Sequence, residues 1–344
     1  MKQYTFGTLP DGRTVTAYEF GNDTLRAVVL NYGGIAQKLV FNGTDVIGGY
    51  DDIEGYLVSD GYQGALIGRY ANRIKGGRFS LNGETVQLAV NEAERGNHIH
   101  GGVLGFDKRI WNAEPFSDKE GEGVVLTLHS PDGEEGYPGN MDVKVTYRIN
   151  GSDYSIHYEA KTDKDTIFNM TNHSYYNMNG IAGGAIYDQT LQINSETMSV
   201  VDENLIPTGT RSTAGTPFDF RTPKLLSKEL MDCDDEQMKF GAGLDHNFYI
   251  TGTDAALFEG RRLVNAAAFS GKLGAVTLYT DTPCVQFYAG NFMAGPYPFK
   301  GGLVREKQHA LCLETQYAPD GPNRGEAILR AGEKYDFTAL FRFH

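Results

Sequence analysis

The sequence is poor in cysteine and proline. Its 344 residues include only three cysteines, Cys233, Cys284 and Cys312, which are far apart and form neither a CxxC pair nor a disulfide framework. We therefore expect free thiols and a cytoplasmic protein. The 12 prolines stand against 43 glycines, and no Pro/Ser-rich linker or internal repeat divides the chain. A single domain spanning residues 1–344 is the expectation.

Long apolar runs and basic clusters are also missing. No uncharged apolar stretch approaches the roughly 18 residues needed to span a bilayer. The N-terminus MKQYTFGTLPDGRTV lacks the apolar core of a secretion signal. The net charge is −13, and no Lys/Arg cluster is available for a phosphate backbone. We expect no membrane and no nucleic acid as a partner.

Aromatic residues and period-two alternation are abundant instead. The chain holds 20 Tyr and 19 Phe, which favour strands. Apolar and polar residues alternate in MDVKVTYRI, residues 141–149, and again in residues 155–160, after the turn NGSD at 150–153. This pattern predicts a hairpin. The run YDFTALFRF, residues 335–343, predicts a further strand with an aromatic face.

Segments with a helical repeat are scarce. We expect only short helical turns, around residues 51–57 and 225–238. Many strands in one chain must hide their edges by pairing two large sheets or by closing a barrel, and a sandwich is the commoner solution. The sequence therefore predicts an all-β fold, a large antiparallel β-sandwich with few short helices.

Five short segments place polar side chains among apolar strand residues. They are GRYANRIKGG (68–77), GNHIHGG (96–102), TNHSYYNMNG (171–180), LDHNF (244–248) and CLETQYAPDG (312–321). Burying Glu314 beside Cys312 and Leu313 is costly unless the carboxylate is paired, hydrogen-bonded or catalytic; alternatively, period two turns it toward solvent. His173, with an ordinary pKa of about 6.5, suits a general acid, although a lone histidine beside aromatics is more often a core residue.

The histidines, the arginine and the aspartate in these segments could each have a structural or a functional role. His98 and His100 would share one face of a regular strand, where such a pair can begin a metal site. Arg73 either holds a ligand or forms a structural salt bridge. Asp245 is equally ambiguous. Together these side chains form the kind of set that a polyhydroxylated ligand requires.

The ordered motifs resemble those of the aldose 1-epimerases (galactose mutarotases). GRYANRI, N-x-IHGG, TNHSYYN, LDHNF, VQFYAGN and CLETQYAPDGPN follow one another over residues 68–323. The N-terminal GTLPDGRTVTAYEFGN and the C-terminal aromatic strand extend the similarity to nearly the whole chain. The resemblance implies a galactose mutarotase-like supersandwich with its site in a cleft on one sheet. It also implies an isomerase that interconverts the α and β anomers of aldohexoses such as galactose and glucose, with no cofactor and no metal.

The resemblance assigns roles to individual residues. His173 corresponds to the family's general acid and Glu314 to its general base. His100, rather than His98, matches the histidine of the HGG motif. The residues that correspond to the sugar-binding set are Asn72, Arg73, His100, Asp245 and Gln286. For acid/base work near neutral pH, Glu314 is expected to be partly desolvated and His173 to keep its proton in the free site.

Alternatives from other classes stay open. A non-catalytic carbohydrate-binding or regulatory protein on the same fold would keep the sugar-binding residues but has no need of an acid and base pair. A metal enzyme would use His98, His100 and Glu314. A glycosidase would need two carboxylates about 5–10 Å apart, and the motifs supply only Glu314 and Asp245. Tyr176 stands where the family more often has Phe and could alter sugar preference. The expected partner is a small sugar, and the chain is compatible with a monomer or a homodimer.

Overall fold

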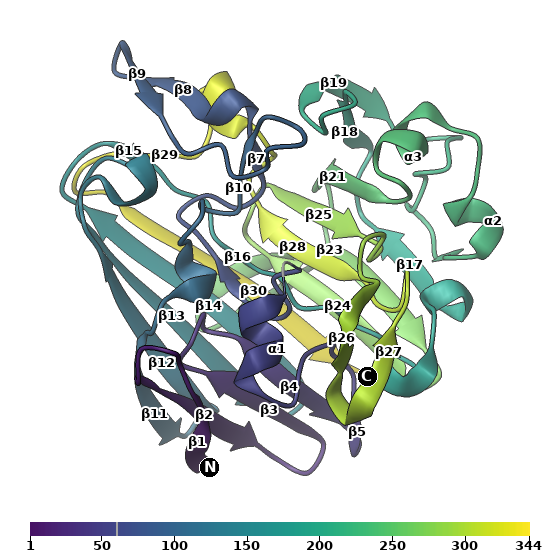
Figure 1. Ribbon diagram of the computed structural model, residues 1–344. Coiled ribbons are helices and arrows are strands. Elements are labelled where there is room, and N and C mark those ends of the chain that lie inside the picture. The colour runs from purple at the N-terminus through teal and green to yellow at the C-terminus, as the bar shows by residue number, and fades with distance from the viewer. Residues whose placement is uncertain (60) are drawn as a thin grey trace.

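The computed structural model describes residues 1–59 and 61–344, and its largest element is an antiparallel sheet of ten strands (Figure 1). The strand order is β11-β12-β13-β14-β30-β24-β23-β17-β20, with β22 paired to β23 outside this path. The strands are β11 (Asn112–Asp118), β12 (Gly121–Ser130), β13 (Met141–Asn150), β14 (Asp153–Thr162), β17 (Thr190–Ile193), β20 (Lys224–Leu225), β22 (Ala255–Phe258), β23 (Arg261–Gly271), β24 (Gly274–Thr280) and β30 (Lys334–Phe343).

Two five-stranded antiparallel sheets accompany the large sheet. The first is formed by the N-terminal strands β1 (Lys2–Thr8), β2 (Thr14–Gly21), β3 (Leu25–Leu30), β4 (Ala36–Phe41) and β5 (Thr44–Asp45). The second has the order β19-β18-β21-β25-β28, and its strands are β18 (Thr197–Val201), β19 (Pro207–Ser212), β21 (Asp245–Tyr249), β25 (Cys284–Tyr288) and β28 (Cys312–Gln316). Figure 1 shows β25 and β28 lying across the layer that contains β23 and β24.

Short two-stranded ribbons and helices complete the described part of the chain. The ribbons pair β6 (Leu66–Ile67) with β16 (Thr171–Asn172), β7 (Arg73–Ile74) with β10 (His98–Ile99), β8 (Arg78–Leu81) with β9 (Glu84–Gln87), β15 (Thr166–Ile167) with β29 (Ile328–Leu329), and β26 (Gly295–Phe299) with β27 (Leu303–Arg305). The α-helices are α1 (Ile53–Val58), α2 (Lys228–Met231) and α3 (Glu236–Phe240). All three begin inside the ranges expected from the sequence.

The predicted hairpin is confirmed. β13 and β14 pair in continuous register from Met141 opposite Thr162 to Asn150 opposite Asp153. The apolar face of β13 is buried throughout, while its polar face is exposed or half-buried. The alternation of apolar and polar residues therefore predicted the inner and outer faces of the sheet correctly.

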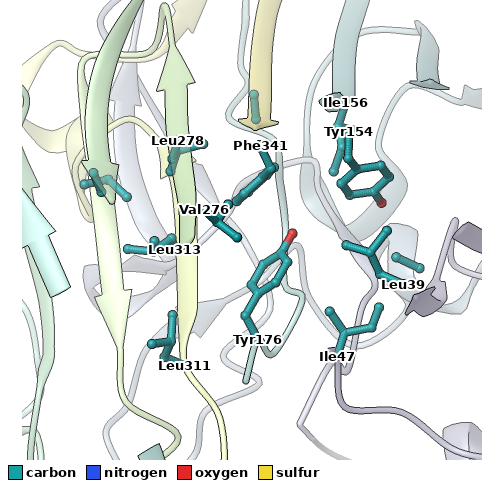
Figure 2. Close-up of a cluster of buried hydrophobic side chains, with 14 of the residues drawn as sticks. Leu39, Ile47, Tyr154, Ile156, Tyr176, Val276, Leu278, Leu311, Leu313 and Phe341 are labelled. Atoms are coloured by element: carbon teal, nitrogen blue, oxygen red, sulfur yellow. The ribbon is translucent and has the colours of Figure 1, made fainter. Parts of the chain in front are cut away.

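The core lies between the large sheet and the elements packed on its inner face. Figure 2 shows Val276, Leu278 and Phe341 of the large sheet gathered in one cluster with Leu313 and Tyr176. All five side chains are almost completely buried. Two layers of antiparallel sheet enclosing one apolar interior confirm the predicted β-sandwich.

No helix in residues 1–59 and 61–344 combines the length and the apolar character needed to cross a membrane.

Candidate active site

Strands β25 and β28 separate the core from a polar face. Along β28, Leu313 packs in the core, while Cys312 and Glu314 point to the opposite side because successive side chains alternate. In the neighbouring strand Gln286 lies opposite Glu314, and Phe287 lies in the core. The period of two thus places a carboxylate inside the protein, on the other side of an apolar layer. The solvent-facing alternative for Glu314 is wrong, since only 2% of it is exposed.

His173 reaches Glu314 from a distant segment. It follows β16, and backbone hydrogen bonds with Ala65 and Gly64, both 2.9 Å long, hold its position. Its Nε2 atom lies 3.7 Å from Oε1 of Glu314. Oε2 of that carboxylate has no hydrogen-bond partner in the described protein. The two side chains therefore face each other across a space that is open to a ligand's hydroxyl groups.

The asparagines beside His173 serve the backbone. Asn172 donates to the carbonyl of Gly64 at 2.7 Å and accepts from Ser174. Asn177 donates to the carbonyl of His309 at 2.7 Å. These hydrogen bonds fix the segment that carries the imidazole.

His100 joins the site through an unusual backbone conformation. β10 ends at Ile99, and His100 has a φ of 51°, so the strand does not continue through it. Its Nδ1 accepts a hydrogen bond from the Asn72 N–H at 3.1 Å, which leaves Nε2 for the cavity. The His100 ring centre lies 5.4 Å from that of His173.

His98 is a core residue. Its two ring nitrogens contact the Ala89 carbonyl at 2.7 Å and the Tyr137 hydroxyl at 2.5 Å, and the side chain is fully buried. The expectation that His98 and His100 share a strand face is wrong, because the left-handed conformation of His100 breaks the alternation. A metal site built on His98 is thereby contradicted.

Three other ligand atoms do lie close together. Side-chain atoms of His100, His173 and Glu314 lie within 4.8 Å of one another, and all three residues are buried. Two imidazoles and one carboxylate form a chemically suitable donor set for a transition metal. Chelation tests whether the protein depends on a metal. The candidate ligands are now His100, His173 and Glu314, with His173 replacing His98 of the predicted set.

Arg73 and Asp245 are both held by neighbours. Arg73 donates from Nε to Oε2 of Glu92 at 3.0 Å and from Nη2 to Oε1 at 2.9 Å. The structural salt bridge is therefore present. Asp245 accepts from Nε2 of Gln286 at 2.7 Å. Arg73 and Asp245 nevertheless line the same cavity, whereas Gln286 is buried next to Asp245. The two interpretations of Arg73 are therefore compatible.

One cavity of about 190 Å³ collects these groups. Six of the seven predicted site residues line it. The seventh, Gln286, supports it through its hydrogen bond to Asp245. The cavity is also lined by residues that the sequence analysis did not single out, namely Tyr62, Gln63, Arg95, Tyr175, Tyr288, Phe292, Met293 and Arg305. Most of these lie outside the polar motifs, so no local pattern marked them. Tyr176 is not among them; it stacks on Phe341 in the core at 5.1 Å, which contradicts a role in sugar preference by contact.

Burial shifts the pKa values of His173 and Glu314, the two residues expected to transfer protons. Loss of hydration lowers the pKa of His173 to about 4. Burial raises the pKa of Glu314 well above its usual value; the Asp245 charge adds to the rise and Arg73 opposes it. Burial likewise lowers the pKa of His100. The lowered His173 pKa runs against the expectation that His173 keeps its proton in the free site. Both shifts favour a protonated Glu314 carboxyl and a neutral His173 imidazole.

Comparison with known proteins places this geometry in a family. The family model described as "Aldose 1-epimerase" matches residues 16–342. A curated galactose mutarotase from Homo sapiens is 41% identical over 348 residues, covering 98% of this chain and 97% of the relative. A curated aldose 1-epimerase from Escherichia coli (strain K12) is 35% identical over 340 residues, covering 96% and 92%.

Solved structures agree with this assignment. A galactose 1-epimerase from Lactobacillus acidophilus superimposes with a TM-score of 0.88 at 30% identity, over 100% of this chain and 98% of that one. An aldose epimerase homologue from C. elegans gives a TM-score of 0.83 at 25% identity, over 95% and 98%. The chain belongs to the aldose 1-epimerase family, whose members are isomerases.

Proposed function

We propose that this protein interconverts the α and β anomers of aldohexoses such as galactose and glucose, with Glu314 and His173 as the proton-transferring groups. The observation that carries the proposal is the distance of 3.7 Å between His173 Nε2 and Glu314 Oε1 in a polar cavity. Each group can contribute about 10²- to 10⁴-fold to the rate. The substrate class follows from the family.

Ring opening needs one base and one acid. The base takes the proton of the C1 hydroxyl, the C1–O5 bond breaks with its electron pair moving to O5, and the acid protonates O5. The aldehyde then rotates about C1–C2 and closes on its other face, with the two groups exchanging roles. The His173–Glu314 pair starts and ends with one proton, so no proton must enter or leave during a turnover.

A single shared proton also reconciles the protonation state with the assigned roles. With the proton on Glu314, the carboxyl is the acid and neutral His173 the base. Once sugar hydroxyls solvate the pair, transfer of the proton to His173 gives the assignment expected from the family, with Glu314 as base. Both arrangements contain the same number of protons, so substrate binding selects between them.

The remaining cavity residues are suited to hold the ring. Arg73 uses Nε and Nη2 for Glu92, so its Nη1 is the nitrogen outside that pair that can donate to a hydroxyl, and Asp245 presents acceptors. Asn72 and His100 are linked by a hydrogen bond, so the backbone of one sets the tautomer of the other. We propose that these groups bind the sugar hydroxyls and supply the orientation that makes proton transfer productive.

Two further properties are part of the proposal. All three cysteines, each of which is described, are free thiols, and this supports a cytoplasmic location. One apolar cluster receives side chains from β2 through β30, and this supports a single domain.

The test is polarimetry of freshly dissolved α-D-galactose, with and without the protein, in buffer containing EDTA. Faster relaxation to an unchanged end point is expected, since anomer exchange involves no net chemistry. An unchanged rate for galactose, glucose, xylose and arabinose would contradict the proposal. Activity that is lost in EDTA and restored by a divalent metal would instead implicate the His100, His173 and Glu314 donor set.

A further inference from the structure

Arg305 is a buried cation in the wall of the proposed sugar cavity. It is the last residue of β27 and is only 7% exposed. Its guanidinium lies over the rings of Tyr50 and Phe299, at 5.6 and 5.8 Å from their centres. An added Cβ at Gly295, its partner across the ribbon, would lie 1.9 Å from Nη2. The glycine thus leaves room for the guanidinium.

The hydrogen-bonding capacity of Arg305 is mostly unused. Nη1 donates to the Tyr50 hydroxyl at 2.9 Å, and Nε has no partner. Within the described part of the chain it forms no ion pair. A guanidinium carries five N–H donors, so one neutral acceptor leaves the group far from satisfied.

Other buried cations of this protein are compensated. Arg73 is bound by the carboxylate of Glu92, and Lys300 lies 2.7 Å from Asp45. Arg69 donates to the carbonyls of Ser130 and Pro131 at 2.8 and 3.0 Å and also to further acceptors. An uncompensated buried charge is costly. The difference suggests that the partner of Arg305 comes from outside the chain.

Of the three cavity arginines, Arg305 is the one that no carboxylate of the described residues pairs, which favours an anion at that position. Three arginines line it, and Glu92 already binds two of them, Arg73 and Arg95. Asp245 is engaged by Gln286. Arg305 also comes from the β26–β27 ribbon, which contributes no other residue to the proposed chemistry. An anionic group held there would be separate from the hydroxyls held by Arg73 and Asp245.

We propose that Arg305 is a specificity residue that binds an anionic substituent of the sugar, so that the substrates include aldoses with a carboxylate or phosphate on carbon 6. This inference rests on the proposed interconversion of anomers and extends its substrate class to anionic aldoses. We place the anion on carbon 6 because it is the one exocyclic carbon of an aldohexopyranose, so an anion there leaves the ring hydroxyls and the anomeric centre unchanged. Guanidinium binds both kinds of anion through two parallel hydrogen bonds.

The experiment compares relaxation of D-galactose, D-galacturonate and D-galactose 6-phosphate by wild type, Arg305→Gln, Arg305→Lys and the control Arg26→Gln. Arg26 is half-exposed and pairs with Glu19 in the N-terminal sheet, and neither residue lines the cavity. We expect wild type to accelerate at least one of the two anionic sugars as well as galactose. For that sugar, the kcat/KM relative to galactose should fall about 30-fold in Arg305→Gln, mostly through KM. Arg305→Lys should fall less, because the charge remains without the fork.

Each outcome bears on the inference. Preference for galacturonate identifies a carboxylate, and preference for the phosphate identifies a phosphoryl group. Acceleration of galactose with no acceleration of either anion by wild type overturns the inference and leaves the proposed function standing. An equal loss for neutral and anionic sugars in Arg305→Gln also overturns it. If neither Arg305 variant folds, stronger inhibition of wild-type galactose turnover by methyl α-D-galactopyranosiduronate than by neutral methyl α-D-galactopyranoside, at matched ionic strength, tests the same charge preference at carbon 6. Equal inhibition by the two glycosides overturns the inference.

Discussion

The sulfur of Cys312 lies 3.5 Å from Nδ1 of His173. Glu314, two residues further along β28 and on the same face, lies 3.7 Å from Nε2 of the same ring. One strand therefore holds the imidazole from both of its nitrogens. Burial keeps Cys312 protonated by raising the pKa of the thiol well above its usual value. Cys312 is thus a positioning residue for His173.

Replacing Cys312 should impair orientation more than folding. We expect Cys312→Ala to lower kcat by about 10- to 100-fold, because a misplaced base or acid loses that much rate. Cys312→Ser should recover most of the loss, since a hydroxyl can make the same contact. The acidic limb of the kcat profile should also move in the Ala variant. Equal kcat values and equal pH profiles for all three proteins would contradict the assignment.

Glu314→Gln should separate chemistry from binding. We expect kcat to fall about 10²- to 10⁴-fold, because the amide cannot exchange a proton with O1 or O5. Calorimetric affinity for galactose should stay nearly unchanged, since Gln keeps the size and the hydrogen-bonding atoms of Glu. A variant with more than half the wild-type rate would exclude Glu314 from proton transfer.

The same substitution should stabilise the fold at alkaline pH. The Glu314 pKa is raised in the folded state, so the folded state binds more protons than the unfolded state above the ordinary carboxyl pKa. Wild-type stability is therefore lost as the pH rises from that value toward the folded pKa, and the neutral amide of the variant cannot contribute to this loss. Thermal unfolding should show a larger gain in Tm for Glu314→Gln at pH 8 than at pH 5. A pH-independent gain would contradict the pKa shift.

The rate should depend on pH through the number of protons on the pair. Below the His173 pKa of about 4, both groups are protonated and no base remains. Above the raised Glu314 pKa, both are deprotonated and no acid remains. We expect kcat/KM to be bell-shaped with its acidic limb near pH 4, well below an ordinary histidine. An acidic limb at about the ordinary histidine pKa of 6.5 would contradict the lowered His173 pKa.

The two histidines His173 and His98 should respond differently to substitution. His173→Gln should abolish most turnover at little cost in stability. His98→Gln should lower Tm, because His98 bridges Ala89 and Tyr137 in the core, but it should leave kcat per folded molecule close to wild type. Activity normalised to the folded fraction, measured by circular dichroism, distinguishes the two. Equal losses would place His98 in the chemistry.

Period-two alternation was enough to predict the hairpin of β13 and β14, because each face of that pair meets one environment. It did not reveal the burial of Glu314, since β28 is buried on both faces and its two sides look alike in sequence. The pairing of His173 with Glu314 joins positions 141 residues apart in number (314 − 173), and only the resemblance predicted it. For His100 the spacing misled, because it suggested a strand face shared with His98. The positive φ of His100 ends the strand alternation before that residue. Arg305 lies in no motif at all.

The alternation of side chains along β28 also limits where insertions and deletions can be tolerated in this protein. One residue inserted between Cys312 and Leu313 would turn Leu313 into the cavity and Glu314 into the apolar layer. Such an insertion would therefore disrupt both the site and the packing of the apolar layer, whereas a point substitution changes one side chain only. Length variation among relatives is expected to accumulate in the connections between strands, with β25 and β28 constant in length. The carboxylate proposed to transfer protons and the neighbouring leucine of the apolar layer are therefore constrained together.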